Sequence, residues 1–240
     1  MTATILTLFP EQLDVNGDSQ NARVLATRAS WAGVPTEVVG VPLGAGVPAT
    51  APAAIVIGSS VDAEIAVVAA ALRPLADRLR GWVADGIPLL AVGTGYELLT
   101  AGVRLATGDE VDGLRIFPGR AEPLASRATD DLVVDTVYGR LIGYENHARG
   151  ISGAFESPLG RVVHGTGNGA GVEGALVGTA IGTHLHGPIL AKNPAVADSL
   201  LALALGERYS ADDARIRQVD DMARAAREVI RARLGVGRGD

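Results

Sequence analysis

The feature that most constrains the fold is a short apolar run that ends in glycine and passes directly into a helical pattern. Leu89 to Val92 has the length and composition of a buried parallel strand, and Gly93-Thr94-Gly95 interrupts it before a helical pattern begins at Tyr96. A strand that turns this sharply into a helix lifts one residue above the edge of a sheet. In hydrolases and acyl-transfer enzymes that residue is the nucleophile, because the strained turn exposes its side chain beside backbone N–H donors. Here the raised residue is Gly93, which has no side chain.

The first hundred residues alternate between strand and helix patterns, which predicts an α/β fold with a doubly wound, mostly parallel sheet. Polar Asp18 precedes the first helical pattern and is expected to cap that helix. We expect strands at Ala3 to Phe9, Thr36 to Val41, Ala54 to Gly58 and Leu89 to Val92, and helices at Asn21 to Ala32 and from about Ala63 to Ala84.

From Gly108 onward the pattern changes to short apolar runs bounded by Gly, Asp and Pro, which predicts an antiparallel extension of the fold. The expected strands are Leu114 to Phe117, Leu132 to Val137, Leu141 to Tyr144 and Gly160 to His164, followed by a helix at Asn193 to Leu205. We expect residues 1–208 to form one domain, because no convincing linker interrupts them.

The last segment, residues 209–240, is expected to form a C-terminal helix that packs on this domain or on a partner. Ser210 followed by Asp213 resembles a capping box. The arginine-rich surface of this helix is most simply a solvated face, and a docking surface for a partner is the less favoured interpretation. The expected apolar face comprises Ile216, Val219, Met222, Ala226 and Ile230.

Composition excludes several classes of protein. The chain has 240 residues, 48% of them hydrophobic, and a formal net charge of -6, so we expect no nucleic-acid partner. No apolar run approaches the roughly 20 residues of a membrane span, and the N-terminus lacks the basic region of a secretory signal, so we expect a cytoplasmic protein without direct membrane insertion. The absence of cysteine excludes disulfides, thiolate metal sites and cysteine nucleophiles.

Three separated motifs carry a more specific resemblance: Leu89 to Leu99, Gly143-Tyr144-Glu145-Asn146-His147, and Gly182 to Pro194. Together they resemble class I (triad-type) glutamine amidotransferases of the cobyric-acid-synthase-like branch. Within that branch the sequence is most similar to the glutaminase-type subunits of lipid II isoglutaminyl synthases, which serve the amidation of D-glutamate in the peptidoglycan stem peptide.

The resemblance assigns roles to individual residues. It implies that His186 is the general base, and Pro188 stands where an acidic third member of a triad would be expected, which implies a Cys–His dyad. Arg127 falls where relatives hold the α-carboxylate of glutamine, a role suited to a guanidinium. Gly58, Ser59 and Ser60 match the loop whose backbone N–H groups help form the oxyanion hole. Thr94 and Tyr96 belong to the elbow motif and Asn146 to a motif near the pocket, so we count all three as candidate substrate-binding residues.

The sequence departs from the family pattern at linked positions. The family has Cys at the position of Gly93, Gln at that of Glu97, and a Gly-Gly-Gly run where this chain has Gly58-Ser59-Ser60. Glutamine hydrolysis in this fold requires a thiolate that attacks the side-chain amide and carries the glutamyl group. Thr94 is one residue displaced from the elbow and is a poor substitute for it.

The resemblance therefore predicts a glutamine-amidotransferase-like subunit that lacks glutaminase activity and still senses or binds glutamine. The implied partner is a Mur-ligase-like synthetase subunit that uses ATP and Mg²⁺, with no cofactor in this chain. Two alternatives remain: an active, ammonia-supplying glutaminase whose cysteine was replaced in the laboratory, and a different cobyric-acid-synthase-like relative. Because a laboratory change would normally alter the cysteine alone, the linked departures favour a naturally inactive site.

Each motif also has a simpler interpretation. The Gly-Thr-Gly turn could be ordinary punctuation or a phosphate cradle at a helix N-terminus, but it lacks the Lys-Ser/Thr ending of a P-loop. His184 and His186 could form a metal pair, yet no third ligand lies near them in sequence, and we expect no metal. We expect His147 and His164 to be structural, and residues 165–171 to form a flexible hairpin or loop with room for a gating role.

Overall fold

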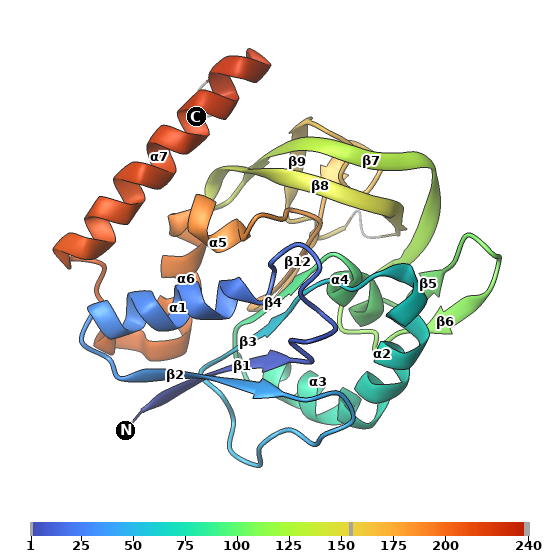
Figure 1. Ribbon diagram of the computed structural model, residues 1–240, viewed down its shortest axis with the longest axis horizontal. Coiled ribbons are helices and arrows are strands. Elements are labelled where there is room, and N and C mark those ends of the chain that lie inside the picture. The colour runs from blue at the N-terminus through green and yellow to red at the C-terminus, as the bar shows by residue number, and fades with distance from the viewer. Residues whose placement is uncertain (1, 154–155, 238–240) are drawn as a thin grey trace.

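A six-stranded sheet forms the centre of the protein. The computed structural model describes residues 2–153 and 156–237 (Figure 1). The strand order is β11-β12-β4-β3-β1-β2, and all neighbouring pairs are parallel except β11 with β12. The mostly parallel, doubly wound sheet predicted from the sequence is therefore confirmed. Its strands are β1 (Ala3–Leu8), β2 (Thr36–Val41), β3 (Ala54–Ile57), β4 (Leu89–Val92), β11 (Ala175–Val177) and β12 (Ala180–Thr183).

Alternating residues of the central strands build two separate apolar cores. Leu6 and Ile57 face a core that includes Leu72 and Leu79. Ile5 and its equivalents in β3 and β4 face the opposite core, because successive strand residues point to opposite faces. The first core is covered by α2 (Ile65–Leu72) and α3 (Ala76–Ala84), and the second by α1 (Gln20–Trp31), α5 (Ile189–Lys192) and α6 (Pro194–Leu205) (Figure 1).

The helix predicted from about Ala63 to Ala84 is divided into four pieces. Two 3₁₀ segments, η1 (Asp62–Glu64) and η2 (Arg73–Leu75), precede α2 and α3. Pro74 lies in η2 and lacks an N–H group for the helical ladder, which accounts for the interruption. A third 3₁₀ segment, η3 (Gly206–Arg208), follows α6.

A second sheet lies beside the first one and has the order β10-β9-β7-β5-β6, with β8 also paired to β7. The predicted short strands 132–137 and 141–144 are the ends of a much longer antiparallel hairpin. The register of this hairpin shifts between Pro123 and Ala128. The strands are β5 (Gly102–Arg104), β6 (Glu110–Asp112), β7 (Arg120–Thr136), β8 (Gly139–Ser152), β9 (Gly160–His164) and β10 (Val172–Glu173).

The predicted strand at 114–117 is wrong. Its backbone N–H groups instead donate to carbonyl groups at the end of α4 (Thr94–Leu99): Leu114 to Leu98 at 2.9 Å and Ile116 to Leu99 at 2.8 Å. The last carbonyl groups of a helix have no partner within the helix, so an adjacent extended segment can satisfy them. The apolar run is buried in this way without joining a sheet.

The C-terminal helix α7 (Ala214–Leu234) begins later than the capping box predicted. Its N-cap is Asp213, whose carboxylate accepts a hydrogen bond from the backbone N–H of Arg215 at 2.8 Å. The expected apolar face is wrong in part, because Ala223 is buried whereas Met222 is 65% exposed. Buried Arg28 in α1 pairs with Asp198 of α6 and Asp220 of α7 at 2.6 and 2.7 Å, which fixes α7 against the body. Within the described residues, no helix combines the length and apolar character needed to cross a lipid bilayer.

Candidate functional site

The site is organised by the turn between β4 and α4. Gly93 has φ +55° and ψ −125°, a conformation that side chains rarely adopt. Its N–H group donates to the Thr183 carbonyl at 2.9 Å, and the Gly95 N–H group donates to the Gly58 carbonyl at 3.0 Å. The turn is therefore held between the ends of β12 and β3, as a strained strand-to-helix elbow requires.

A cavity of about 270 Å³ opens beside this elbow. Its walls come from the elbow, the loop after β3, the segment after β12 and the β7–β8 hairpin. Segments that are far apart in the sequence therefore meet at one place. The predicted site residues that line this cavity are Ser59, Ser60, Gly93, Thr94, Arg127, Asn146 and His186.

Gly58 and Tyr96, also predicted as substrate-binding residues, do not line the cavity. A Cβ atom at Gly58 would lie 2.1 Å from the Leu13 carbonyl oxygen, so glycine is needed there for close backbone packing. Tyr96 is fully buried, and its ring packs edge-on against Phe117 and His184 at centroid distances of 5.3 and 5.4 Å. The structure places this side chain in the core, where it supports the helix that follows the elbow.

The imidazole of His186 has a carboxylate partner that the sequence did not reveal. Its Nδ1 lies 2.9 Å from Oδ2 of Asp18, and both side chains are buried. The expectation that Asp18 caps α1 is wrong, because the N-cap is Ser19 and the Asp18 carboxylate faces His186 instead. The carboxylate absent from position 188 is thus supplied from a loop 168 residues away in the chain. The separation left no sequence pattern that could have revealed this pair.

Asn16 is a second residue that sequence analysis missed. Its side-chain amide donates to Ser59 Oγ at 3.2 Å and lies 3.5 Å from His186 Nε2. Its amide oxygen is 3.5 Å from the side-chain nitrogen of Asn146. Asn16 therefore joins the loop after β1 to three parts of the cavity wall.

His186 is also attached to the second sheet. Its backbone N–H group donates to the Tyr144 carbonyl at 2.8 Å, forming an isolated antiparallel bridge with β8. The Tyr144 ring lies near the imidazole, with a centroid distance of 5.5 Å. The position of the imidazole is therefore set by both sheets.

The space beside Gly93 is too small for a side chain. A Cβ atom at Gly93 would lie 2.8 Å from Ser59 Cβ and 2.9 Å from His186 Cε1. Ser59 Cβ cannot easily retreat, because it is attached directly to the backbone and its Oγ donates to Asp18 Oδ2 at 2.5 Å. Ser59 and Gly93 are therefore sterically linked: the serine fits because position 93 has no side chain.

The loop predicted to supply oxyanion-hole donors already has one donor occupied. The Ser60 N–H group donates to Thr94 Oγ1 at 2.5 Å, and the two hydroxyl oxygens lie 3.3 Å apart. A backbone N–H group can stabilise a developing oxyanion only if it points to that oxygen without another acceptor. In this arrangement Thr94 acts as a local acceptor for the loop.

Arg127 lies at the mouth of the cavity, near the register shift in β7. Its Nε donates to Asn146 Oδ1 at 2.8 Å and its Nη2 donates to the Asn146 carbonyl at 3.2 Å. Because the side chain is exposed, Asn146 fixes the guanidinium while leaving donors for a ligand. This geometry suits recognition of a carboxylate.

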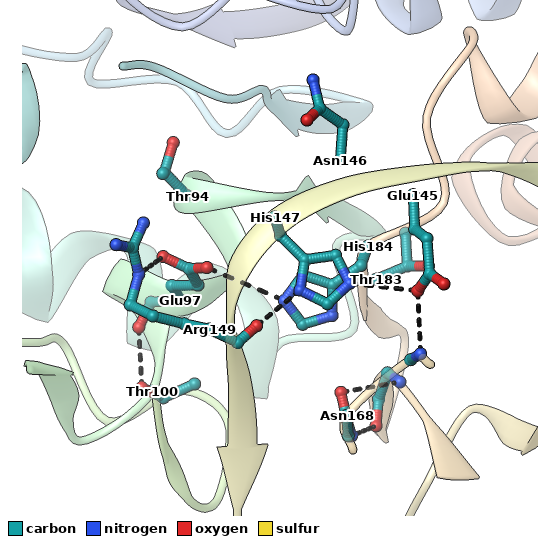
Figure 2. A network of polar contacts seen from close by, with 12 residues as sticks. Thr94, Glu97, Thr100, Glu145, Asn146, His147, Arg149, Asn168, Thr183 and His184 are labelled. Carbon is teal, nitrogen blue, oxygen red and sulfur yellow. Dashed lines mark hydrogen bonds and ion pairs between the residues drawn. The ribbon is translucent and has the colours of Figure 1, made fainter. Parts of the chain in front are cut away.

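A mostly buried network of charges forms one wall of the cavity (Figure 2). Arg149 donates to Glu97 Oε2 at 2.7 Å and to both carboxylate oxygens of Asp62 at 2.9 and 2.8 Å. Burial alone would raise the pKa of Glu97, but His184 and Arg149 lower it. The hydrogen bond from Arg149 likewise lowers the pKa of Asp62. The glutamate at position 97 is therefore an ionised member of a paired network.

His184 connects this network to β10. It is buried between Glu173 and Glu97, with ring nitrogens 3.4 and 3.8 Å from their carboxylates. Burial alone would lower the pKa of His184, but these carboxylates raise it to about 9. Burial and the adjacent His184 lower the pKa of His147, which stacks on His184 at a centroid distance of 4.0 Å. One histidine is thus charged and its neighbour neutral.

The two histidines considered as a metal pair have different partners. His184 pairs with Glu173 and Glu97, whereas His186 pairs with Asp18. Residues 2–153 and 156–237 contain no group of three or more histidine and acidic side chains placed to hold a metal ion. The geometry instead gives each imidazole a carboxylate neighbour.

The glycine-rich segment 165–171 is anchored at its start. Glu145 accepts hydrogen bonds from the backbone N–H groups of Thr166 and Gly167 at 2.6 and 2.9 Å, and its carboxylate lies 3.1 Å from His147 Nε2. Asn168 is buried and bonds to Gly174 in both directions (Figure 2). The segment joins the antiparallel strands β9 and β10, so the predicted hairpin is confirmed.

Comparison with known proteins identifies the family. The profile of the CobB/CobQ-like glutamine amidotransferase domain matches residues 10–194, which include the elbow, the cavity and His186. The chain belongs to this family.

Two proteins with similar sequences are both named as the subunit GatD of lipid II isoglutaminyl synthase. The chain is 31% identical over 204 residues to the lipid II isoglutaminyl synthase (glutamine-hydrolyzing) subunit GatD of Staphylococcus aureus, covering 84% of both chains. It is 28% identical over 165 residues to the subunit GatD of Streptococcus pneumoniae, covering 65% of this chain and 62% of the relative.

Solved structures support the fold. A glutamine amidotransferase structure superposes with a TM-score of 0.54 at 17% identity, covering 83% of this chain and 98% of the other. The structure of PurLQS from Thermotoga maritima gives a TM-score of 0.55 at 14% identity, covering 92% and 99%. These likenesses concern the fold alone, and they agree with the predicted class I architecture.

Proposed function

We propose that this chain is a glutamine-amidotransferase-like subunit of a lipid II isoglutaminyl synthase-type complex that binds glutamine without hydrolysing it. The observation that carries the proposal is the steric link between Ser59 and Gly93. A cysteine added to the present elbow would have its Cβ only 2.8 Å from Ser59 Cβ. The loss of the nucleophile is therefore accompanied by a change in the neighbouring wall, which a laboratory substitution of one cysteine does not explain.

The second support is the retained ligand geometry. Arg127 is fixed by Asn146 at the cavity mouth, and acidic Asp62 and Glu97 lie among the lining residues. The remaining donors of the Arg127 guanidinium suit the α-carboxylate of an amino acid, whereas the carboxylates of Asp62 and Glu97 are already paired with Arg149. The cavity thus has groups for binding glutamine even though the elbow has no thiolate to attack its amide.

In the proposed complex, a partner subunit would use ATP to activate the acceptor carboxylate. Both curated relatives are named as subunits, and a Mur-ligase-like synthetase with ATP and Mg²⁺ is the partner that we propose here. In such a complex this chain would position or sense glutamine beside the synthetase. Its acceptor would be the D-glutamate of the peptidoglycan stem peptide.

Measuring glutamate release from glutamine tests the missing step. We expect none from the natural chain and none from Gly93→Cys, because Ser59 occupies the space of the new side chain. The double variant Gly93→Cys with Ser59→Gly removes the closer of the two contacts and leaves the one with His186 Cε1 at 2.9 Å, so its elbow can carry a thiol only if the imidazole shifts. Rapid glutamate release from the single variant would contradict the proposal and favour an active ancestor altered only at position 93.

Calorimetry with glutamine tests the binding step separately. We expect heat of binding from the natural chain and at least a tenfold loss of affinity in Arg127→Ala, the fold-change that corresponds to about 1.4 kcal/mol. Arg161→Ala, at an exposed position of β9 outside the cavity, is the matched control and should bind normally. Equal affinity in Arg127→Ala would remove this residue from the proposed pocket.

A further inference from the structure

A second cavity, of about 650 Å³, lies between α7 and the β8 strand, and its charged lining consists of four arginine side chains and Glu228. Three of these arginines, Arg224, Arg227 and Arg231, come from α7, and Arg140 comes from β8. Residues spaced three and four apart lie on one side of a helix, with Cβ atoms about 5–6 Å from one another. The spacing therefore aligns three guanidinium groups along one wall of this arginine groove.

Asp135, Asp221 and the lining Glu228 neutralise the positive charge of the groove only in part. Arg140 pairs with Asp135 at 2.6 Å, and Arg224 pairs with Asp221. Within the described part of the chain, no ion pair is found for Arg227 or Arg231, and the buried Nε of Arg231 has no hydrogen-bond partner. Burial is the main cause that lowers the pKa of Arg227; Arg224 and Arg231 lower it further, while Asp220 and Glu228 oppose the shift.

This arrangement is unfavourable for the isolated protein. Like charges one helical turn apart destabilise a helix, and a buried donor without an acceptor loses its hydration. The whole chain has a net charge of -6, so an excess of positive charge at one place is not a consequence of a basic composition. A bound anion would remove both penalties, because it supplies acceptors and opposite charge together.

The geometry favours a multiply charged anion over a single carboxylate. Arg227 and Arg231 are one turn apart, so one ligand must present acceptors to two guanidinium groups at the same time. A diphosphate carries several oxygens on two adjacent centres, and guanidinium groups bind phosphate oxygens in a bidentate manner. The groove is also larger than one small anion requires.

We propose that the groove formed by α7 and β8 is a binding site for a diphosphate group, with Arg227 and Arg231 as its principal ligands. The diphosphate belongs to a nucleotide or to a lipid, because both sources present the same charged group. The site is separate from the cavity beside Gly93, and the inference does not depend on the proposed function.

Isothermal titration of the full chain with sodium pyrophosphate at low salt tests the site. We expect saturable binding that weakens as sodium chloride is raised, because salt screens partly exposed charges. The double variant Arg227→Gln with Arg231→Gln should lose affinity about tenfold or more, which corresponds to the loss of one charge-assisted hydrogen bond or more. Arg217→Gln, which makes one similar change of charge at an exposed position outside the groove, should bind pyrophosphate normally.

Two further measurements identify the source of the diphosphate and test the role of the guanidinium group. ADP and phosphatidylcholine vesicles doped with a lipid diphosphate distinguish the two sources, and binding of either one supports the site. Arg227→Lys keeps the charge but loses the planar fork, so its affinity should lie between those of the natural chain and the double variant. Absence of pyrophosphate binding, or equal affinity in the natural chain and Arg227→Lys and the double variant, would overturn the proposal.

Discussion

The elbow around Gly93 and the charge network beside it both depart from the family sequence, but with different results: the elbow has no reactive side chain, whereas the network keeps its ion pairs. At the elbow the backbone geometry is complete, but Ser59 fills the space of the side chain that would react. In the network, Glu97 also differs from the family pattern, yet Arg149 pairs with its Oε2 at 2.7 Å and His184 Nε2 lies 3.8 Å from its Oε1. The comparison teaches that a fold can preserve its strained turn and its buried charges after the atom that forms the covalent bond is gone.

Removing the guanidinium from the network should have the largest effect. Arg149→Met leaves Glu97 buried without its closest cation, and breaking such a buried pair typically destabilises a protein by about 3–5 kcal/mol. Urea unfolding measures the difference. Arg104→Met removes an arginine from solvent-accessible pairs with Glu110 and Glu122 and should cost about 1 kcal/mol or less per pair. Similar losses from both variants would contradict the importance assigned to burial.

The next effect is a dependence of stability on pH that originates at His184. Because the pKa of His184 is raised to about 9 from an ordinary value of 6.5, its contribution is complete below pH 6.5 and is lost as the pH rises through 9. The free energy of unfolding at pH 6.5 and pH 9.5 should therefore differ more in the natural chain than in His184→Gln. Equal pH dependence in the two proteins would show that His184 is not a charged member of the network.

A methyl group at the elbow should have a smaller effect. Gly93→Ala places a Cβ against Ser59 and forces a side chain into an unfavourable φ, so we expect a loss of about 1–3 kcal/mol. Ser59→Gly should recover part of this loss because it removes the opposing Cβ. Ser59→Ala keeps that Cβ and is the matched control. A double-mutant cycle in which glycine and alanine at position 59 behave identically would disprove the steric link.

The smallest effect concerns the hydroxyl group of Ser59. Ser59→Ala removes the hydrogen bond donated to Asp18 and the one accepted from Asn16, while the contact between Asp18 and His186 remains. We expect a loss of about 1–2 kcal/mol in the free energy of unfolding, since one hydrogen bond contributes a net value of about 1 kcal/mol. Thermal unfolding measures it, and a loss as large as that of Arg149→Met would show that the elbow is not the weaker of the two regions.

The parts of the fold that the sequence predicted are those governed by local periodicity. The strands at Thr36–Val41 and Leu89–Val92 and the elbow at Gly93 have short-range signals in apolar runs and glycine. The segment 114–117 looked like a strand because it is apolar, but its backbone bonds to the end of α4, a contact that no local pattern encodes.

Long-range contacts also limited the prediction of the site. The motifs identified His186, Arg127 and Asn146, and the structure brings them to one cavity. Asp18 and Asn16 were missed because their partners lie 168 and 170 residues away and a polar loop before a helix has a commoner local explanation. Tyr96 was assigned to the ligand because it belongs to the motif, whereas its burial shows that the motif also encodes packing.

The bridge between Tyr144 and His186 joins the β7–β8 hairpin to the base of the cavity. A hydrogen-bonded strand is stiff along its length, so tilting the hairpin would carry the imidazole and the guanidinium of Arg127 in the same movement. One strand, β8, therefore sets the positions of two cavity residues that come from different parts of the chain.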